Sequence, residues 1–328
     1  MDTRLNAGLR LAESDEQRDD NLDVADIVTG LRAVRDQWRR SHHREQERGG
    51  REFPSREAID GIVSHLCGIL FPMRLGPADL QQENEDYYVG HTLNLALRAM
   101  LDQVKLELRY GARLNGNPDN DLDRRALNTV SAFASHLPSL RAILDKDVEA
   151  AFKGDPAARS VDEVLLCYPG LLAIIHHRLA HTLYRLELPL IARIVSELAH
   201  SGTGIDIHPG ATIGESFFID HGTGVVIGET AVIGNRVRLY QAVTLGAKRF
   251  SLSENGELTK GQPRHPVVED DVVIYAGATI LGRIVIGRGS VIGGNVWLTH
   301  SVPPGSHVTQ ARSQQELVEA TPAPSSAA

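Results

Sequence analysis

Hydrophobic positions along this chain follow two different periods. Between about residues 57 and 201 they recur every three or four residues, which places them on one face of an α-helix. The clearest stripe consists of Leu93, Leu97, Met100, Val104 and Leu108. Pro189 suits the first turn of a further helix, and Gly202 and Gly204 are expected to end it. The pattern predicts an all-helical domain over residues 57–201.

From Ile205 onward the hydrophobic period is six residues. The recurring aliphatic residues are Ile207, Ile213, Ile219, Ile227, Ile233, Leu239, Leu245, Val268, Ile274, Ile280, Ile286, Ile292 and Leu298. The period slips by two residues after Ile219, and a long loop at 247–263 interrupts it. An α-helix repeats about every 3.6 residues and an alternating strand every two, whereas a six-residue repeat is typical of a β-helix. The expected fold is therefore α+β: a helical domain followed by a parallel β-helix over residues 202–309.

Charged or low-complexity segments flank these two domains. Residues 1–56 form a charged N-terminal extension that is expected to be partly helical or disordered, and its stretch 24–48 suits one exposed helix. The arginines of this stretch are interrupted by Glu45 and Glu47, which is typical of a solvated face. Residues 310–328 are rich in Pro, Ser and Ala and are expected to be disordered.

Composition excludes several classes of protein. The chain has 328 residues, enough for two domains, and a net charge of −8 without any Lys and Arg cluster free of acidic residues. We therefore expect no nucleic-acid partner. No apolar run approaches the ~20 residues that span a bilayer, and the first residues lack a signal peptide's apolar core, so we expect no membrane association and a cytoplasmic location. Cys67 and Cys167 are too few for a disulfide framework.

Several short segments carry a more specific signal. In chain order they are Gly154-Asp155-Pro156, GIDIHP at 204–209, FIDHGTGVVIGET at 218–230, QAVTLG at 241–246 and Arg264-His265-Pro266. Over about residues 140–308 the chain resembles the serine O-acetyltransferases, a family of hexapeptide-repeat acyltransferases. The resemblance implies a left-handed β-helix, acetyl-CoA as cosubstrate and the hydroxyl of L-serine as acceptor, in cysteine biosynthesis. It also implies a homotrimer or a dimer of trimers, with active sites between neighbouring β-helices.

His221 and Asp206 are the candidate catalytic residues. A hydroxyl that attacks a thioester needs a general base, and histidine, with a reference pKa near ~6.5, suits that task. His221 follows Asp220 where the six-residue period slips, and Asp206 lies 15 residues earlier, close to one coil of three hexads. A carboxylate in that place would fix the imidazole tautomer and stabilise the imidazolium. A histidine on an exposed turn is the plainer alternative.

Four further residues are candidates for binding the amino acid. The planar guanidinium of Arg264 suits a carboxylate, and the resemblance implies that His265 assists it while Asp155 and Asp220 bind the ammonium group. A loop-anchoring Arg-His pair and a plain Gly-Asp-Pro turn are the structural alternatives. Small residues allow a close approach of the pantetheine arm. The resemblance places coenzyme A in a groove between β-helices, near Gly246, Ala276, Gly277 and Gly294.

No metal site is expected. His177 and His181 lie four residues apart on one helical face, but no acidic or cysteine partner accompanies them, which favours buried histidines. His208 resembles a family position in the active-site region, and a structural imidazole explains it equally well. Glu229 is expected to orient the site locally, and Trp297 to be an apolar lid rather than a ligand platform.

The chain departs from the family pattern in three places. The 247–263 loop is long and directly precedes Arg264, so the acceptor preference could be altered. The N-terminal extension could change how trimers pair. Many family members end in an isoleucine that enters cysteine synthase, whereas this chain ends in Ala328, which makes binding to cysteine synthase doubtful.

Three alternative functions stay open at this point. The first is a hexapeptide acetyltransferase with another acceptor, either homoserine or a sugar hydroxyl. Arg264 and the paired aspartates suit an acceptor with a carboxylate and an ammonium group, which argues against a sugar. A zinc carbonic anhydrase on a similar β-helix would need His208, His221 and His265 to converge on one metal between chains. A third alternative is a scaffold protein without catalytic activity. Such a protein would not need an aspartate at 206 together with a histidine at 221.

Overall fold

A computed structural model describes residues 24–42, 52–114, 121–248 and 261–310. The chain divides into two compact units, Met1–Gly50 and Arg51–Ala328, which are described separately. In the first unit, helix α1 (Val24–Ser41) buries none of its residues. The predicted helix over 24–48 therefore includes α1, and its residues beyond His42 lie outside the described part. Within the described residues, no helix has the length and apolarity needed to cross a bilayer.

The second unit begins with helices. They are α2 (Arg56–Leu70), α3 (Pro72–Leu75), the short 3₁₀ helix η1 (Gln82–Asn84), α4 (Glu85–Leu114), α5 (Leu122–Gly154), α6 (Val161–Cys167), α7 (Pro169–Arg185) and α8 (Pro189–Thr203). The carboxylate of Glu107 accepts hydrogen bonds from the backbone N–H groups of Leu190 and Ile191, which satisfies donors that the start of α8 leaves free. Gly204, at φ +70°, caps the end of α8, whereas Gly202 lies inside its last turn.

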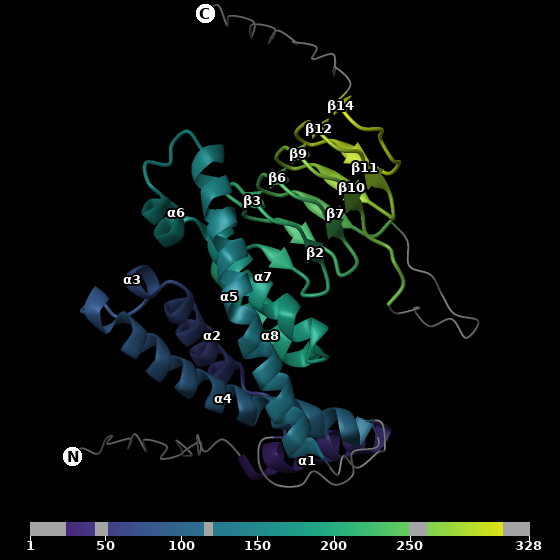
Figure 1. The fold of residues 1–328 in the computed structure, drawn as a ribbon. Helices are drawn as coiled ribbons and strands as arrows, with labels where there is room; N and C mark the ends of the chain where they lie inside the picture. The colour runs from purple at the N-terminus through teal and green to yellow at the C-terminus, as the bar shows by residue number, and fades with distance from the viewer. Residues whose placement is uncertain (1–23, 43–51, 115–120, 249–260, 311–328) are drawn as a thin grey trace, which may run out of the picture. The chain divides into compact units, whose positions relative to one another are not determined.

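Fourteen short strands follow in the described part. They are β1 (Asp206–Ile207), β2 (Thr212–Ile213), β3 (Phe218–Ile219), β4 (Val226–Ile227), β5 (Val232–Ile233), β6 (Arg238–Leu239), β7 (Thr244–Gly246), β8 (Val267–Val268), β9 (Val273–Ile274), β10 (Thr279–Leu281), β11 (Val285–Ile286), β12 (Val291–Ile292), β13 (Trp297–Leu298) and β14 (His307–Val308). They form three parallel sheets, ordered β1-β4-β7-β10-β13, β2-β5-β8-β11 and β3-β6-β9-β12-β14. From β4 to β13 each strand therefore stacks on the strand three positions earlier, and β14 stacks on β12. Figure 1 shows the resulting coils in green to yellow.

The interior of these coils confirms the six-residue period. All thirteen aliphatic positions of the repeat are buried, the most exposed being Ile213 at 7%. In regular coils the register advances by 18 residues, as where Val226 pairs with Thr244, which corresponds to three hexads per turn. The α+β architecture of helices followed by a parallel β-helix is thereby confirmed.

Two insertions into the repeat lie on different edges of the β-helix. The two-residue slip falls in the connection from β3 to β4, and the long loop falls in the connection from β7 to β8. The first connection passes from the β3 sheet to the β1 sheet, and the second from the β1 sheet to the β2 sheet. We call the first the His221 edge, formed by residues 220–225, 240–243, 275–278 and 293–296. We call the second the Arg264 edge, formed by residues 208–211, 228–231, 261–266 and 282–284.

Candidate functional site

The slip in the repeat projects His221 away from the β-helix. His221 has φ +58°, a backbone conformation that non-glycine residues seldom adopt, and its side chain is 70% exposed. Its Nδ1 lies 3.7 Å from Oδ1 of Asp220, whose side chain is only 13% exposed. The inserted turn thus presents an exposed imidazole next to a largely buried carboxylate.

Asp155 joins this pair from the helical side. It follows the last turn of α5, where the Tyr168 hydroxyl donates to its Oδ2 at 2.5 Å and the Ala157 N–H donates to its Oδ1 at 2.8 Å. These bonds, the Tyr168 bond above all, lower the pKa of Asp155, with help from the charges of His221 and Arg238. The same bond is the main reason why the pKa of Tyr168 rises to about 12. The structure therefore brings three of the predicted site residues together, with Asp155 held as an anion.

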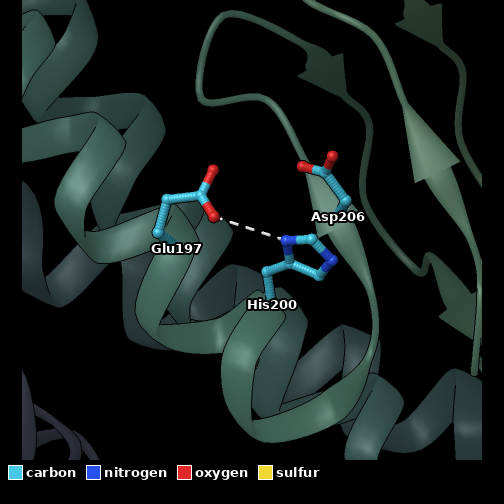
Figure 2. Close-up of side chains that lie close together, drawn as sticks. All are labelled: Glu197, His200 and Asp206. Carbon is cyan, nitrogen blue, oxygen red and sulfur yellow. Dashed lines mark hydrogen bonds and ion pairs between the residues drawn. The ribbon is translucent and has the colours of Figure 1, made fainter.

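Asp206 lies on β1, toward the end of α8. Figure 2 shows its carboxylate above the imidazole of His200, whose Nδ1 is 3.3 Å from Oε2 of Glu197. One potential ligand atom from each of these three side chains lies within 4.8 Å of the others, and no other such trio of His, Cys, Asp or Glu occurs among the described residues. No hydrogen bond or ion pair joins Asp206 to His221 in the described part of the chain. The expected carboxylate–imidazole pair is thus not formed in this single chain.

The Arg264 edge holds the second group of predicted residues. The Arg264 guanidinium donates from Nη2 to Oε2 of Glu229 at 2.6 Å, and Tyr184 donates to Oε1 of the same carboxylate at 3.2 Å. The Thr230 hydroxyl accepts hydrogen bonds from the backbone N–H groups of Arg264 and His265, at 2.9 and 3.1 Å. Thr230 therefore fixes the point where the long loop rejoins the coil, a role that its place in the motif did not reveal.

His265 is held as a neutral imidazole. Its Nδ1 lies 3.0 Å from the backbone N–H of Thr230, which must donate to it, so the ring proton belongs on Nε2. Burial is the main cause that lowers the pKa of His265 to about 4, and the charge of Arg264 adds to the effect. Gly228 makes room for the ring, because a Cβ there would lie 2.1 Å from Nε2. The ring can donate one hydrogen bond without carrying charge.

The residues expected near coenzyme A divide between the two edges. Ala276, Gly277 and Gly294 lie on the His221 edge, above the turn that carries His221, while Gly246 ends β7 and leads into the Arg264 edge. Gly277 has φ +72°, and a Cβ there would meet Oδ1 of Asn295 at 2.2 Å. The turn itself therefore requires this glycine, whatever ligand approaches it.

The other histidines of the sequence analysis do not gather in one place. His208 lies on the Arg264 edge with His265, where its Nδ1 accepts from the Gly210 N–H at 3.0 Å, while His221 lies on the other edge. His177 is buried, and His181 is tied to the Pro209 carbonyl at 2.8 Å through its Nδ1. Three histidines that converge on one metal are not found among the described residues of one chain.

Comparisons with known proteins give one consistent result. A family model described as bacterial transferase hexapeptide (six repeats) matches residues 265–300. The chain is 57% identical over 269 residues to the plasmid serine acetyltransferase of Synechococcus elongatus, covering 81% of this chain and 84% of that protein. It is 49% identical over 166 residues to serine acetyltransferase of Bacillus subtilis, covering 51% of this chain and 72% of that protein.

Solved structures agree with these relatives. Serine acetyltransferase isoform 3 of Entamoeba histolytica, in complex with cysteine, has a TM-score of 0.66 and 36% identity, and the match covers 79% of this chain and 84% of that one. Serine acetyltransferase 1 of the same organism, in complex with L-cysteine, has a TM-score of 0.65 and 34% identity, with 87% of this chain and 100% of that one covered.

Proposed function

The chain belongs to the serine acetyltransferase family, and we propose that it transfers the acetyl group of acetyl-CoA to the hydroxyl of L-serine. The products are O-acetylserine and free coenzyme A, and the reaction supplies cysteine biosynthesis. The observation that carries this proposal is the likeness to a serine acetyltransferase over four fifths of the chain. The cluster of Asp155, Asp220 and His221 supports it, because these groups suit an acceptor with both an ammonium group and a hydroxyl.

His221 would act as the general base. As its imidazole takes the serine hydroxyl proton, the hydroxyl oxygen attacks the thioester carbonyl and a tetrahedral intermediate forms. The carbon–sulfur bond then breaks, and the leaving thiolate takes a proton from the imidazolium. Asp155 and Asp220 would bind the substrate ammonium, and the lowered pKa of Asp155 keeps its charge available for this.

Asp206 would orient the imidazole once the site is assembled. We retain Asp206 as the anionic partner of His221 because both residues belong to the first coil, Asp206 on β1 and His221 just after β3. In the single chain its neighbours are Glu197 and His200 (Figure 2).

We further propose that the working enzyme is a homotrimer in which two chains complete each site. The two groups of predicted residues lie on different edges of one β-helix, with the β1 sheet between them. A threefold arrangement would set the His221 edge of one subunit against the Arg264 edge of the next, three times over. Acetyl-CoA would lie in that groove, along Ala276, Gly277 and Gly294 of one subunit and Gly246 of its neighbour. Light scattering distinguishes a trimer from a dimer of trimers.

Release of thiol from acetyl-CoA, with L-serine, L-homoserine and L-threonine as acceptors, tests the activity. We expect L-serine to give the highest kcat/KM. Homoserine is the second candidate, because the long loop at 247–263 lies directly before Arg264. Thiol release that does not depend on any hydroxyl amino acid would contradict the proposal.

Mixed trimers test the shared site. One chain carries His221→Asn, and the other carries Arg264→Met together with His265→Asn. If each site combines both edges from neighbouring subunits, equal co-expression restores about one quarter of wild-type activity, because one in four random interfaces has both edges intact. A site built within one chain would give no restoration.

L-cysteine would compete with L-serine for this site, since it differs from serine only in bearing sulfur in place of the hydroxyl oxygen. The Entamoeba enzymes in complex with cysteine support this part of the proposal. Steady-state inhibition by cysteine that raises the KM for serine without changing kcat is the expected result. The cytoplasmic location expected from the sequence stays a prediction, which fractionation of the source cells would test.

A further inference from the structure

Arg238 has no carboxylate partner among the described residues. Its Nε is buried and makes no hydrogen bond, and no ion pair to Arg238 within 4.0 Å occurs among the described residues. It lines a cavity of about 380 Å³. The other cations of that cavity have carboxylate partners: Lys146 pairs with Glu215, Lys153 with Glu149 and Arg236 with Asp271. A buried N–H donor without an acceptor costs free energy, so it points to an anionic partner outside the chain.

The arginine is nevertheless held in place. It lies on β6 directly beside Phe218 of β3, and its Cζ is 4.9 Å from the centre of the Phe218 ring. The ring centre of Tyr240 lies 5.4 Å from the same Cζ atom. Stacking on aromatic faces orients a guanidinium without using its N–H groups, which stay free for a ligand. The side chain is therefore oriented before any ligand binds.

Asp155 lies next to this guanidinium without neutralising it. Gly154 precedes Asp155, and a Cβ on Gly154 would meet an Arg238 terminal nitrogen at 2.8 Å, so Arg238 covers the end of α5. Both carboxylate oxygens of Asp155 are already bonded, one to the Tyr168 hydroxyl and one to the Ala157 N–H. These bonds keep the Asp155 carboxylate in place, so an unpaired cation and an ammonium-binding anion stand side by side.

This arrangement matches the geometry of an α-amino acid. The ammonium and the carboxylate of such a ligand are attached to one carbon, so their binding groups must be neighbours in the site. Arg264, the carboxylate ligand expected from the sequence, stands on the other edge and already bonds Glu229 at 2.6 Å. Among the described residues, no carboxylate forms a comparable bond with Arg238.

We propose that Arg238 is a specificity-determining residue that binds the α-carboxylate of the amino-acid acceptor, beside Asp155 and Asp220 of the same chain. This inference rests on the proposed function and deepens it. It implies that one subunit alone supplies both charges needed to recognise an amino acid, and that Arg264 of the neighbouring subunit adds a second contact to the same carboxylate. Acceptors without a carboxylate would be rejected mainly through Arg238.

Steady-state kinetics of Arg238→Met, with L-serine and with L-serinamide, tests the proposal. Methionine keeps the packing on the two rings and removes the charge. We expect the KM for L-serine to rise about 10- to 100-fold, as for a lost hydrogen bond to a charged group, with kcat changed less than about threefold. The KM for acetyl-CoA and the kcat/KM for L-serinamide should stay close to wild type. Arg238→Lys should restore part of the loss.

Arg236→Met is the matched control, because Arg236 lines the same cavity but is paired with Asp271. It should leave the KM for L-serine unchanged, and equal melting temperatures would show that all variants are folded. A KM for L-serine in Arg238→Met equal to wild type, or an equal loss with L-serinamide, would overturn the assignment and leave the proposed function standing. Absence of serine-dependent turnover in the wild type would instead overturn both.

Discussion

Arg178 and Asp147 form a two-point ion pair, buried where the helices meet the β-helix. Arg178 donates from Nε to Oδ2 of Asp147 at 3.0 Å and from Nη2 to Oδ1 at 3.1 Å. The same guanidinium donates to the carbonyl oxygens of Ile213 and Gly214, and the Phe217 N–H donates to Oδ1 of Asp147. Burial raises the pKa of Asp147 to about 6, against the opposing effect of Arg178. The pair anchors the first coil, which carries Asp206 and leads to His221.

Arg178→Met should therefore destabilise the protein strongly. Removing one partner leaves the Asp147 carboxylate buried without a countercharge, and such losses cost about 3–5 kcal/mol. Urea unfolding at fixed protein concentration measures the change. Lys153→Met is the control, because its partner Glu149 is exposed and the pair contributes at most about 1 kcal/mol. Equal losses in the two variants would show that the buried pair has no special role.

His221→Asn should fold and assemble but lose about 10²- to 10⁴-fold in kcat, the usual contribution of a general base. Asparagine is the best replacement because it tolerates the positive φ of this position, whereas His221→Ala combines the loss with backbone strain. Thiol release at saturating serine measures the effect. Asp206→Asn should also lower kcat, since the imidazole loses its anionic partner. Near-normal turnover of His221→Asn would remove this residue from the mechanism.

Arg264→Lys should raise the KM for serine more than the KM for acetyl-CoA. Lysine keeps the charge but cannot reproduce the planar fork that Glu229 holds in position. Glu229→Gln should act in the same direction with a smaller effect, because it only loosens the guanidinium. If the KM for acetyl-CoA suffers instead, Arg264 belongs to the cosubstrate groove.

His265 should titrate near pH 4 in the folded protein, because burial and the charge of Arg264 disfavour its protonation. The unfolded chain binds this proton near pH ~6.5, so the contribution of His265 to stability is present above that pH. It should be lost as the pH falls from about 6.5 to 4. NMR titration of the imidazole gives the pKa directly. The melting temperature of His265→Asn should depend less on pH over this range, and His300→Asn, an exposed control, should behave as wild type.

The interior of the β-helix could be read from the sequence in advance. The six-residue period identified thirteen inward aliphatic positions, and all of them are buried. It did not reveal a second buried position two residues earlier, which Ala211, Val225, Val243 and Ala278 occupy in four of the hexads. Small and medium side chains at that position vary too much to form a visible period. The end of α8 at Gly204 could also be predicted, because the left-handed conformation of a helix cap depends only on the residue that adopts it.

The sequence motifs likewise identified candidate site residues, but they did not show which of these residues are in contact in the folded chain. Asp155 and Asp220 could be chosen from short segments, but their meeting depends on where the end of α5 packs against the β3 sheet. The bond between Arg264 and Glu229 joins residues on opposite sides of the long loop. Arg238 carried no signal at all, because an arginine at an outward position of a hexad is ordinary.

What the sequence determined by itself is the set of side chains that face inward, and with it the β-helix, the helical domain and the family. Local sterics and a short repeat are sufficient for that, because each hexad folds in the same way as the one before it. The tertiary structure alone decided which outward side chains become neighbours. That depends on the stacking of coils, which pairs Phe218 with Arg238, and on two insertions of different length that place His221 and Arg264 on separate edges. Contacts of this kind depend on the length of every connection in a coil, and no single motif contains that information.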